Sequence, residues 1–124
     1  MLNFKDFIKE SQSKDIIITL PAHIEWSDYE RELDRVKDGN EVINFKVPFL
    51  PKSQPRRVYL CWRGNIVGYQ NCCGMVSKAD FTCTTTGRQW EGNFIQRTGP
   101  FYHIEPIEQK GFQGFRYFDS SVQV

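Results

Sequence analysis

Aromatic and cationic side chains alternate through the second half of the chain in a pattern that suits the binding of nucleobases. Bases stack on aromatic rings, and arginine or lysine adds contacts to phosphate. Trp90 is the preferred ring, because it follows the polar stretch 84–89 and has polar neighbours. The alternative is that most of these rings belong to the core and most of the arginines to the surface. The aromatic candidates are Trp62, Tyr69, Trp90, Phe112, Phe115 and Tyr117, and the cationic candidates are Arg57, Arg63, Arg88, Arg97, Lys110 and Arg116.

Residues that support covalent or metal chemistry form no recognisable set in this sequence. The sequence has no Ser-His-Asp order and no glycine-rich phosphate loop. The cysteines include no Cys-x-x-Cys pair, and the two histidines stand alone. We therefore predict reduced, mostly buried thiols, no catalytic residue, no metal site and no cofactor. The residues concerned are Cys61, Cys72, Cys73, Cys83, His23 and His103.

The composition is typical of one globular domain. The chain has 124 residues, of which 40% are hydrophobic and 15% aromatic, enough for a single core without disulfides. A net charge of +1 argues against non-specific nucleic-acid binding driven by charge alone, but it allows a local basic patch. No apolar run is long enough to span a bilayer, and no secretory signal is recognisable. We expect a soluble intracellular protein with a helical leader or tail over 1–14 and a single domain over 15–124.

Residues 57–69 are expected to form the central hairpin of the domain. Two runs rich in β-branched and aromatic residues flank Gly64-Asn65, a pair that accepts the positive φ values of a two-residue turn. With this turn, Leu60 faces Tyr69 and Trp62 faces Val67. One face then holds Val58, Leu60, Trp62, Val67 and Tyr69, and the other holds Arg57, Tyr59, Cys61, Arg63 and Gln70.

One helix is clearly marked. Ser27-Asp28-Tyr29-Glu30 fits a capping box, and Asp38-Gly39-Asn40 supplies the end of the helix. Between them, the apolar residues Tyr29, Leu33 and Val36 recur on one helical face. The sequence therefore predicts a helix of about three turns that packs on the sheet.

Strand patterns fill most of the remaining chain. The runs are 15–20, 41–47, 71–76, 81–86, 90–97, 101–104 and 111–118, with the segments 81–86 and 90–97 pairing around Gly87-Arg88. Three prolines place an exposed loop over 48–57, while Gly68 and Gly74 indicate bulges. The fold class is predicted to be α+β: a small, strongly curved β-sheet or partly open barrel with one main helix near the N-terminus.

The first ten residues resemble a known leader. Phe4, Phe7 and Ile8 form a short apolar stripe, and Ile8-Lys9-Glu10 fits a cleavage signal. This stretch is similar to the capsid-targeting leaders of internal head proteins from T-even-type bacteriophages, which a prohead protease removes. The resemblance implies processing at Ile8 and Glu10, and either packaging in the virion head or action in the host cytoplasm.

The order of elements resembles the PUA-like superfamily, in particular its ASCH and EVE branches. The ASCH motif is Gly-x-Lys-x-x-Glu-x-Arg, and this chain has Gly39, Glu41, Asn44 and Lys46 at those positions, so that only the glycine is retained. The Asn44-Phe45-Lys46 triplet is similar to an element that lines a modified-base pocket in EVE domains. The resemblance implies a PUA-like barrel with a cleft for a nucleotide, modified base or nucleic acid. The ligand-binding candidates are Asn44, Lys46, Arg57, Arg63, Arg88 and Trp90.

The sequence is also compatible with two other functions. A protein delivered with phage DNA is suited to blocking a host defence or restriction protein, which requires complementary shape and charge but no reactive group. Some small ASCH proteins are amidohydrolases that use a lysine, a threonine and a glutamate. Lys46, Glu41 and one of Thr82, Thr84, Thr85 and Thr86 are the residues such an activity would use here. The oligomeric state is not predicted.

Overall fold

The computed structural model describes the backbone of residues 15–82 and 89–118 and the side chains of residues 15–77 and 92–118. The predicted leader with Ile8 and Glu10 and the Gly87-Arg88 turn lie outside these residues. The elements are β1 (Asp15–Thr19), α2 (Trp26–Val36), β2 (Ile43–Val47), β3 (Arg57–Trp62), β4 (Asn65–Thr82), β5 (Gln89–Glu108) and β6 (Phe115–Phe118).

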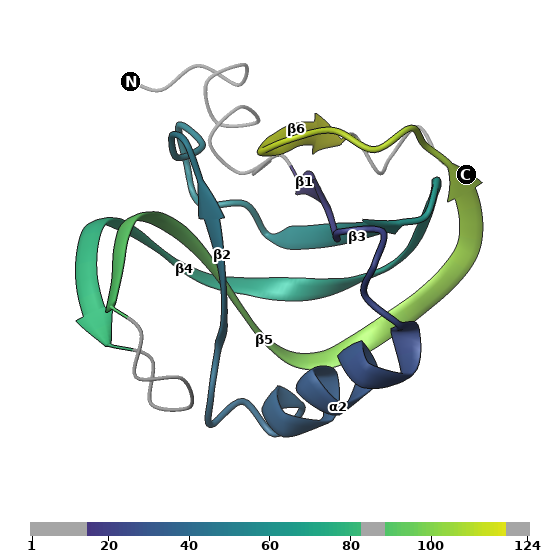
Figure 1. The fold of residues 1–124 in the computed structure, drawn as a ribbon, viewed down its shortest axis with the longest axis horizontal. Coiled ribbons are helices and arrows are strands. Elements are labelled where there is room, and N and C mark those ends of the chain that lie inside the picture. The colour runs from purple at the N-terminus through teal and green to yellow at the C-terminus, as the bar shows by residue number, and fades with distance from the viewer. Residues whose placement is uncertain (1–14, 83–88, 119–124) are drawn as a thin grey trace, which may run out of the picture.

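The fold is α+β, with one helix and a mixed sheet of six strands (Figure 1). The strand order is β2-β5-β4-β3-β1-β6, and only the pair β1 and β3 is parallel. The sheet is not closed, because β2 and β6 form its two edges. The predicted fold class is therefore confirmed at the level of an α+β domain with one helix near the start of the described chain.

The sheet is buried on both faces around β1. Ile16 and Ile18 belong to the core between the sheet and α2, while Ile17 belongs to a second core on the opposite face. All three isoleucines are at most 3% exposed. This explains the nearly continuous β-branched run in the sequence, since a central strand contacts apolar side chains on both sides.

Helix α2 buries the three residues that its sequence pattern indicated, but it does not begin with a capping box. Tyr29, Leu33 and Val36 are buried, as predicted. The N-cap is Glu25, and no side chain caps this end. The helix starts earlier than predicted because the Trp26 ring packs against Trp62, at 5.5 Å between ring centroids, which draws the preceding turn into the helix.

The predicted end of the helix is confirmed. Gly39 has a φ of 84°, which glycine adopts without strain, and its N–H donates to the Val36 carbonyl at 3.0 Å.

The β3–β4 hairpin exists, but the predicted turn and register were wrong. Trp62 pairs with Asn65, so the two turn residues are Arg63 and Gly64, with φ values of 48° and 85°. These are the positive values of a type I′ turn. Arg63 tolerates this conformation because its side chain is held by hydrogen bonds from Nε to the Ala22 carbonyl and from Nη2 to Glu25.

A register shift beyond this turn moves two residues to the faces opposite those predicted. The shift lies between Leu60 and Cys61 on β3, and Tyr69 now pairs with Tyr59 instead of Leu60. As a result, Tyr69 packs on the second core, and Gln70 is fully buried. The second face of the hairpin is therefore an apolar core around Tyr59 and not a polar surface.

The long strands β4 and β5 carry further irregularities at the predicted positions. Register shifts fall between Ile66 and Gly68 and between Cys72 and Gly74, which confirms that both glycines mark bulges. The backbones of Phe81 and Thr82 pair with those of Trp90 and Gln89, as expected for the next hairpin.

The loop after β2, residues 48–56, leads from the edge strand β2 to the interior strand β3 and contacts the opposite edge of the sheet on its way. Its Phe49 ring lies 5.5 Å from Phe115, between ring centroids, and the Lys52 N–H donates to the Tyr117 hydroxyl at 3.3 Å. Both partners belong to β6, which lies at the opposite edge from β2 (Figure 1). The proline-rich loop is thus held against the sheet, although Phe49 itself remains exposed.

Candidate functional site

Three tyrosines form a row across adjacent strands on the face opposite α2. Tyr59 of β3 pairs with Tyr69 of β4, which in turn pairs with Tyr102 of β5. The ring centroids of Tyr59 and Tyr69 are 5.2 Å apart, and those of Tyr69 and Tyr102 are 5.1 Å apart with the planes inclined by 29°. We call Tyr59, Tyr69 and Tyr102 the tyrosine row. Cross-strand pairing holds each ring in place.

Exposure rises from one end of the tyrosine row to the other. Tyr59 is 4% exposed, whereas Tyr102 is 44% exposed. Strand β2 pairs with β5 only between Asn93 and Arg97, so none of the described strands continues the sheet beyond Tyr102. The Tyr102 ring therefore offers an accessible face that is already stacked on its inner side.

Arg57 lies over the middle of the tyrosine row. Its guanidinium carbon is 4.4 Å from the centroid of the Tyr69 ring, and Nη1 donates to the Tyr59 hydroxyl at 3.4 Å. This hydrogen bond raises the pKa of Arg57, whose guanidinium is in any case charged at physiological pH. The cation thus contacts Tyr69, and Tyr69 in turn stacks on the exposed ring of Tyr102; a cation and an exposed ring in one row can bind a base together with its phosphate.

A buried carboxylate positions the backbone of Arg57. Asp15, which is 3% exposed, accepts the Arg57 N–H at 3.1 Å, and it forms an ion pair with Arg56 at 3.6 Å. Two consecutive arginines are therefore fixed at the end of the sheet where β1 and β3 begin.

The structure does not bring the other predicted ligand residues to Arg57. Asn44 and Lys46 lie on β2, three strand positions away in the sheet, or about 14 Å. The Asn44 side-chain oxygen accepts a hydrogen bond from Gln96 at 3.1 Å. The Lys46 side chain covers Gly92 of the neighbouring strand β5, where an added Cβ would lie 2.9 Å from Lys46 Cε.

Arg63 is placed at the far end of β3 from Arg57. Besides its bonds to Ala22 and Glu25, its guanidinium carbon lies 4.5 Å from the centroid of the Trp62 ring. Trp62 donates its indole N–H to the Ile24 carbonyl at 2.9 Å. Both side chains thus secure the segment that leads into α2. The remaining candidates, Arg88 and the side chain of Trp90, lie outside the described part of the chain.

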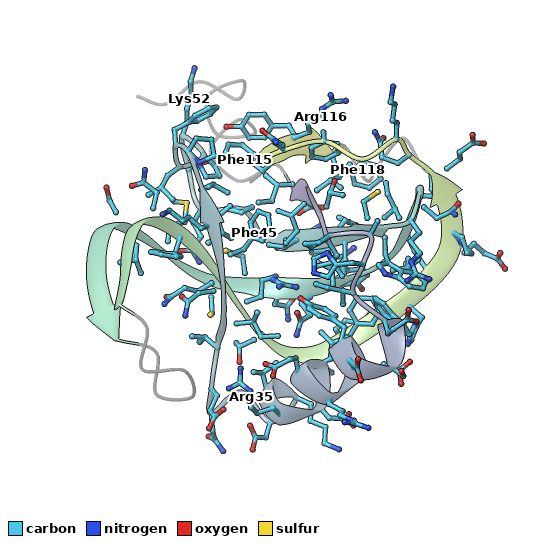
Figure 2. All side chains as sticks on the ribbon, in the orientation of Figure 1. Arg35, Phe45, Lys52, Phe115, Arg116 and Phe118 are labelled. Atoms are coloured by element: carbon cyan, nitrogen blue, oxygen red, sulfur yellow. The ribbon has the colours of Figure 1, made fainter. Side chains whose placement is uncertain are left out.

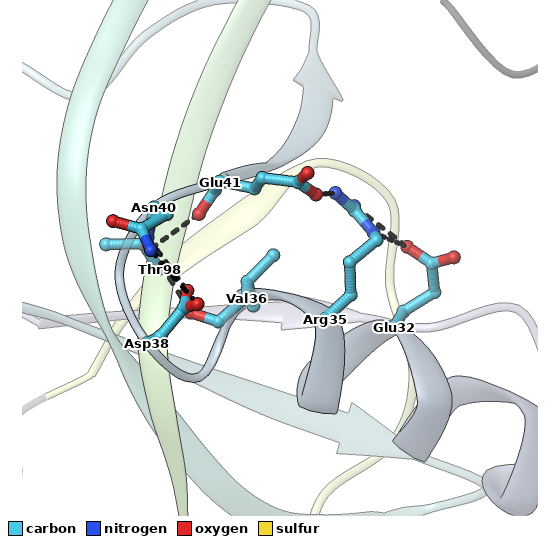
Figure 3. A network of polar contacts seen from close by, with 7 residues as sticks. All are labelled: Glu32, Arg35, Val36, Asp38, Asn40, Glu41 and Thr98. Atoms are coloured by element: carbon cyan, nitrogen blue, oxygen red, sulfur yellow. Dashed lines mark hydrogen bonds and ion pairs between the residues drawn. The ribbon is translucent and has the colours of Figure 1, made fainter.

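Of the predicted lysine, threonine and glutamate set, only Lys46 and Glu41 have side chains among the described residues. Glu41 forms an ion pair with Arg35, and Arg35 also forms an ion pair with Glu32 (Figure 3). The backbone carbonyl of Glu41 accepts a hydrogen bond from the Thr98 hydroxyl. This network ties the end of α2 to β5. The side chain of Thr82 and residues 84–86 lie outside the described structure.

Arg97, one of the cationic candidates, is buried in the core, which its sequence pattern did not indicate. Arg97 is 1% exposed, with Nη1 donating to Gln70 at 3.1 Å and Nη2 to the Tyr29 hydroxyl. Its Nε has no hydrogen-bond partner, and no carboxylate lies within ion-pair distance, among the described residues. Tyr59 and Tyr102 were also missed, because their alignment depends on the register of three strands.

The thiols follow the prediction except at Cys73. Cys61 is buried, Cys72 is half-buried, and Cys73 is exposed because the register shift at this point turns it outward. Burial raises the pKa of the Cys61 and Cys72 thiols, so both remain protonated at neutral pH. Cys83 lies outside the described residues.

Nowhere in the described part do three His, Cys, Asp or Glu side chains gather as a metal site would require. Within the same part, no helix is long and apolar enough to cross a bilayer.

Comparison with known proteins gives no relative from which a function could be transferred. The chain matches no family model, no curated protein and no solved structure.

Proposed function

We propose that this domain binds a nucleobase, as part of a nucleotide or nucleic acid, on the exposed ring of Tyr102, with Arg57 as the cationic partner. The observation that carries the proposal is the stacking of Tyr102 on Tyr69 at 5.1 Å while 44% of Tyr102 remains exposed. An accessible aromatic ring that a stacked neighbour already holds in place offers a flat face on which a base can stack.

The tyrosine row is suited to binding because its geometry exists before the ligand arrives. Tyr69 lies between Tyr102 and Arg57, so Tyr102 loses little rotamer freedom when a base stacks on it. Base stacking on a ring contributes about 1–3 kcal/mol, and the cation adds an attraction to phosphate. Because only the outer face of Tyr102 is free in this row, the row accommodates one base.

We infer a partly open PUA-like barrel, and the contact of the loop 48–56 with β6 supports a sheet whose edges approach each other. The leader-like residues Ile8 and Glu10 favour a phage protein that acts in the host cytoplasm or is packaged in the virion head.

Titration with labelled oligonucleotides and unlabelled nucleotides tests the proposal. Replacing Tyr102 by alanine is expected to weaken binding about 5- to 100-fold, because it removes one stacked base. Tyr102→Phe keeps the ring and should retain most of the affinity. Fluorescence anisotropy gives the Kd, and circular dichroism verifies that each variant is folded.

Arg31→Gln is the matched control. Arg31 is exposed on α2 and lies away from the tyrosine row, so this variant should bind like the wild type. Equal affinities of wild type and Tyr102→Ala would refute the proposed site.

A further inference from the structure

Charge is segregated between two ends of the molecule, although the net charge is only +1. Residues 43–57 and 109–118 contain no acidic residue. Figure 2 shows Lys52 and Arg116 on the side of β6, and Arg35 on the side of α2. We call the first region the basic end; its cations are Lys52, Arg56, Arg57 and Arg116, and the buried carboxylate of Asp15, which forms an ion pair with Arg56, lies among them. The opposite region carries Glu25, Asp28, Glu30, Glu32, Asp34, Asp38 and Glu41 against Arg31, Arg35 and Lys37.

The basic end also exposes a second group of aromatic rings. Phe49 is 64% exposed and Tyr117 is 48% exposed. Phe115 lies between them, with centroid distances of 5.5 Å to Phe49 and 5.6 Å to Tyr117. We call these three residues the aromatic edge. Tyr102, Phe49 and Tyr117 are the large exposed hydrophobic residues of the described chain.

In strand order the arginine pair lies between the two aromatic groups, which are on opposite faces of the sheet: Phe115 packs against the core under α2 and Tyr69 against the second core. A ligand that contacts both groups therefore passes around the end of the sheet where Arg56 and Arg57 lie. Tyr117 of β6 pairs with Ile16 of β1, which pairs with Val58 of β3, the residue after Arg57. In strand order, β6 and β5 are four positions apart, or about 19 Å. A single nucleotide cannot reach from Tyr102 to the aromatic edge, whereas a strand of about four or more nucleotides can.

We propose that the ligand of the tyrosine row is a single-stranded nucleic acid that extends over the basic end, with phosphates at Arg56 and Arg57 and a second base on the aromatic edge. This inference rests on the proposed function of Tyr102. An acidic protein would also match the charge, but it would not require exposed ring faces at both ends of the arginine pair. In a duplex the base faces are stacked on one another, so they are not available to stack on the rings of the protein.

Affinity as a function of strand length tests the inference. Thymidine monophosphate and the oligonucleotides dT2, dT4 and dT8 are titrated as competitors against fluorescein-labelled dT8. The affinity is expected to rise at least 10-fold from dT2 to dT8. Phe49→Ser should weaken dT8 binding about 5-fold or more while leaving the monophosphate unaffected, because the aromatic edge contacts only the longer ligand.

Salt dependence tests the phosphate contacts. Lys52→Gln and Arg56→Gln should each reduce the slope of log K against log salt by about 0.7, the value expected for one single-strand phosphate contact. Arg31→Gln, at the acidic end, should leave the slope unchanged. Lys52→Gln remains informative if Arg56→Gln destabilises the ion pair with Asp15.

Three results would count against the inference, and they are distinguishable. Equal affinities for the monophosphate and dT8, with no effect of Phe49→Ser, would overturn the extended ligand but leave the single-base site intact. If heparin bound as tightly as dT8, and if no ring substitution changed the affinity for dT8, the surface would bind polyanions in general. That result would overturn both base sites. No binding of any nucleotide by the folded protein would overturn the proposed function itself.

Discussion

Arg97 is the most unusual single residue of the described chain, because its guanidinium is buried without a carboxylate partner among the described residues. The charge is compensated by two neutral acceptors, the Gln70 amide oxygen and the Tyr29 hydroxyl. Removing one acceptor from a buried cation costs more than removing an ordinary hydrogen bond, since water cannot replace it.

We expect Tyr29→Phe to lower the free energy of unfolding by about 1.5–3 kcal/mol, the range for hydrogen bonds to charged groups. Tyr102→Phe removes an exposed hydroxyl and should change stability by less than about 0.5 kcal/mol. Urea denaturation of both variants measures the difference. If Tyr29→Phe were as stable as Tyr102→Phe, the Tyr29 hydroxyl would not contribute to holding the buried charge.

At the level of single elements, the sequence predicted what depends on neighbouring residues. The apolar face of α2 and the strand at β1 follow from local periodicity, and both are confirmed. The start of α2 and the β3–β4 register depend on distant contacts instead. Trp26 joins the helix through packing on Trp62, and the Arg63 turn is held by Ala22 and Glu25, so no local rule could identify them.

The two glycines at the bulges of β4, Gly68 and Gly74, are expected to differ in how well they tolerate replacement by alanine. A Cβ at Gly68 would overlap the Tyr102 carbonyl and the Phe101 ring, whereas one at Gly74 would approach only the flexible end of Gln96, at 2.9 Å. We expect Gly68→Ala to destabilise the protein by about 2–3 kcal/mol and Gly74→Ala by less than about 1 kcal/mol. Thermal and urea unfolding provide the comparison.

Gly68 also holds Phe101 and Tyr102 in position, because its lack of a side chain lets β5 approach. Similar stabilities of Gly68→Ala and Gly74→Ala would mean that β5 moves aside at little cost, and that the tyrosine row is less fixed than its stacking indicates.

At the scale of the whole molecule, strand order decides which candidate residues meet. Asn44, Lys46, Arg57 and Arg63 are close in sequence, yet β2 pairs with β5 and β3 pairs with β4. These long-range pairings separate β2 from β3 and align Tyr59, Tyr69 and Tyr102. Arg57 was a sequence candidate because of its residue type and neighbours, whereas the alignment of the three tyrosines beside it could not be predicted, because it depends on these pairings.

The segregation of charge predicts weak self-association at low ionic strength. The Debye length is about 30 Å at 0.01 M salt and about 8 Å at 0.15 M, so the acidic end of one molecule attracts the basic end of another only at low salt. Light scattering should show a higher apparent mass at about 0.01 M salt that returns to the monomer value at 0.15 M. A mass that does not depend on salt would argue against this separation of charge.

The position of β1 between β3 and β6 has a consequence for newly made protein. β1 is synthesised before both of its hydrogen-bonding partners, and β6 is the last of the described strands. Ribosomes add about 5–20 residues per second, so the roughly 100 residues from β1 to β6 take about 5–20 seconds. Until β6 is made, the edge of β1 that β6 covers in the fold lacks its hydrogen-bonding partner, and an exposed β-branched edge of this kind favours aggregation. Shielding of this edge by the ribosome or by a chaperone should therefore reduce aggregation of the nascent chain until β6 emerges.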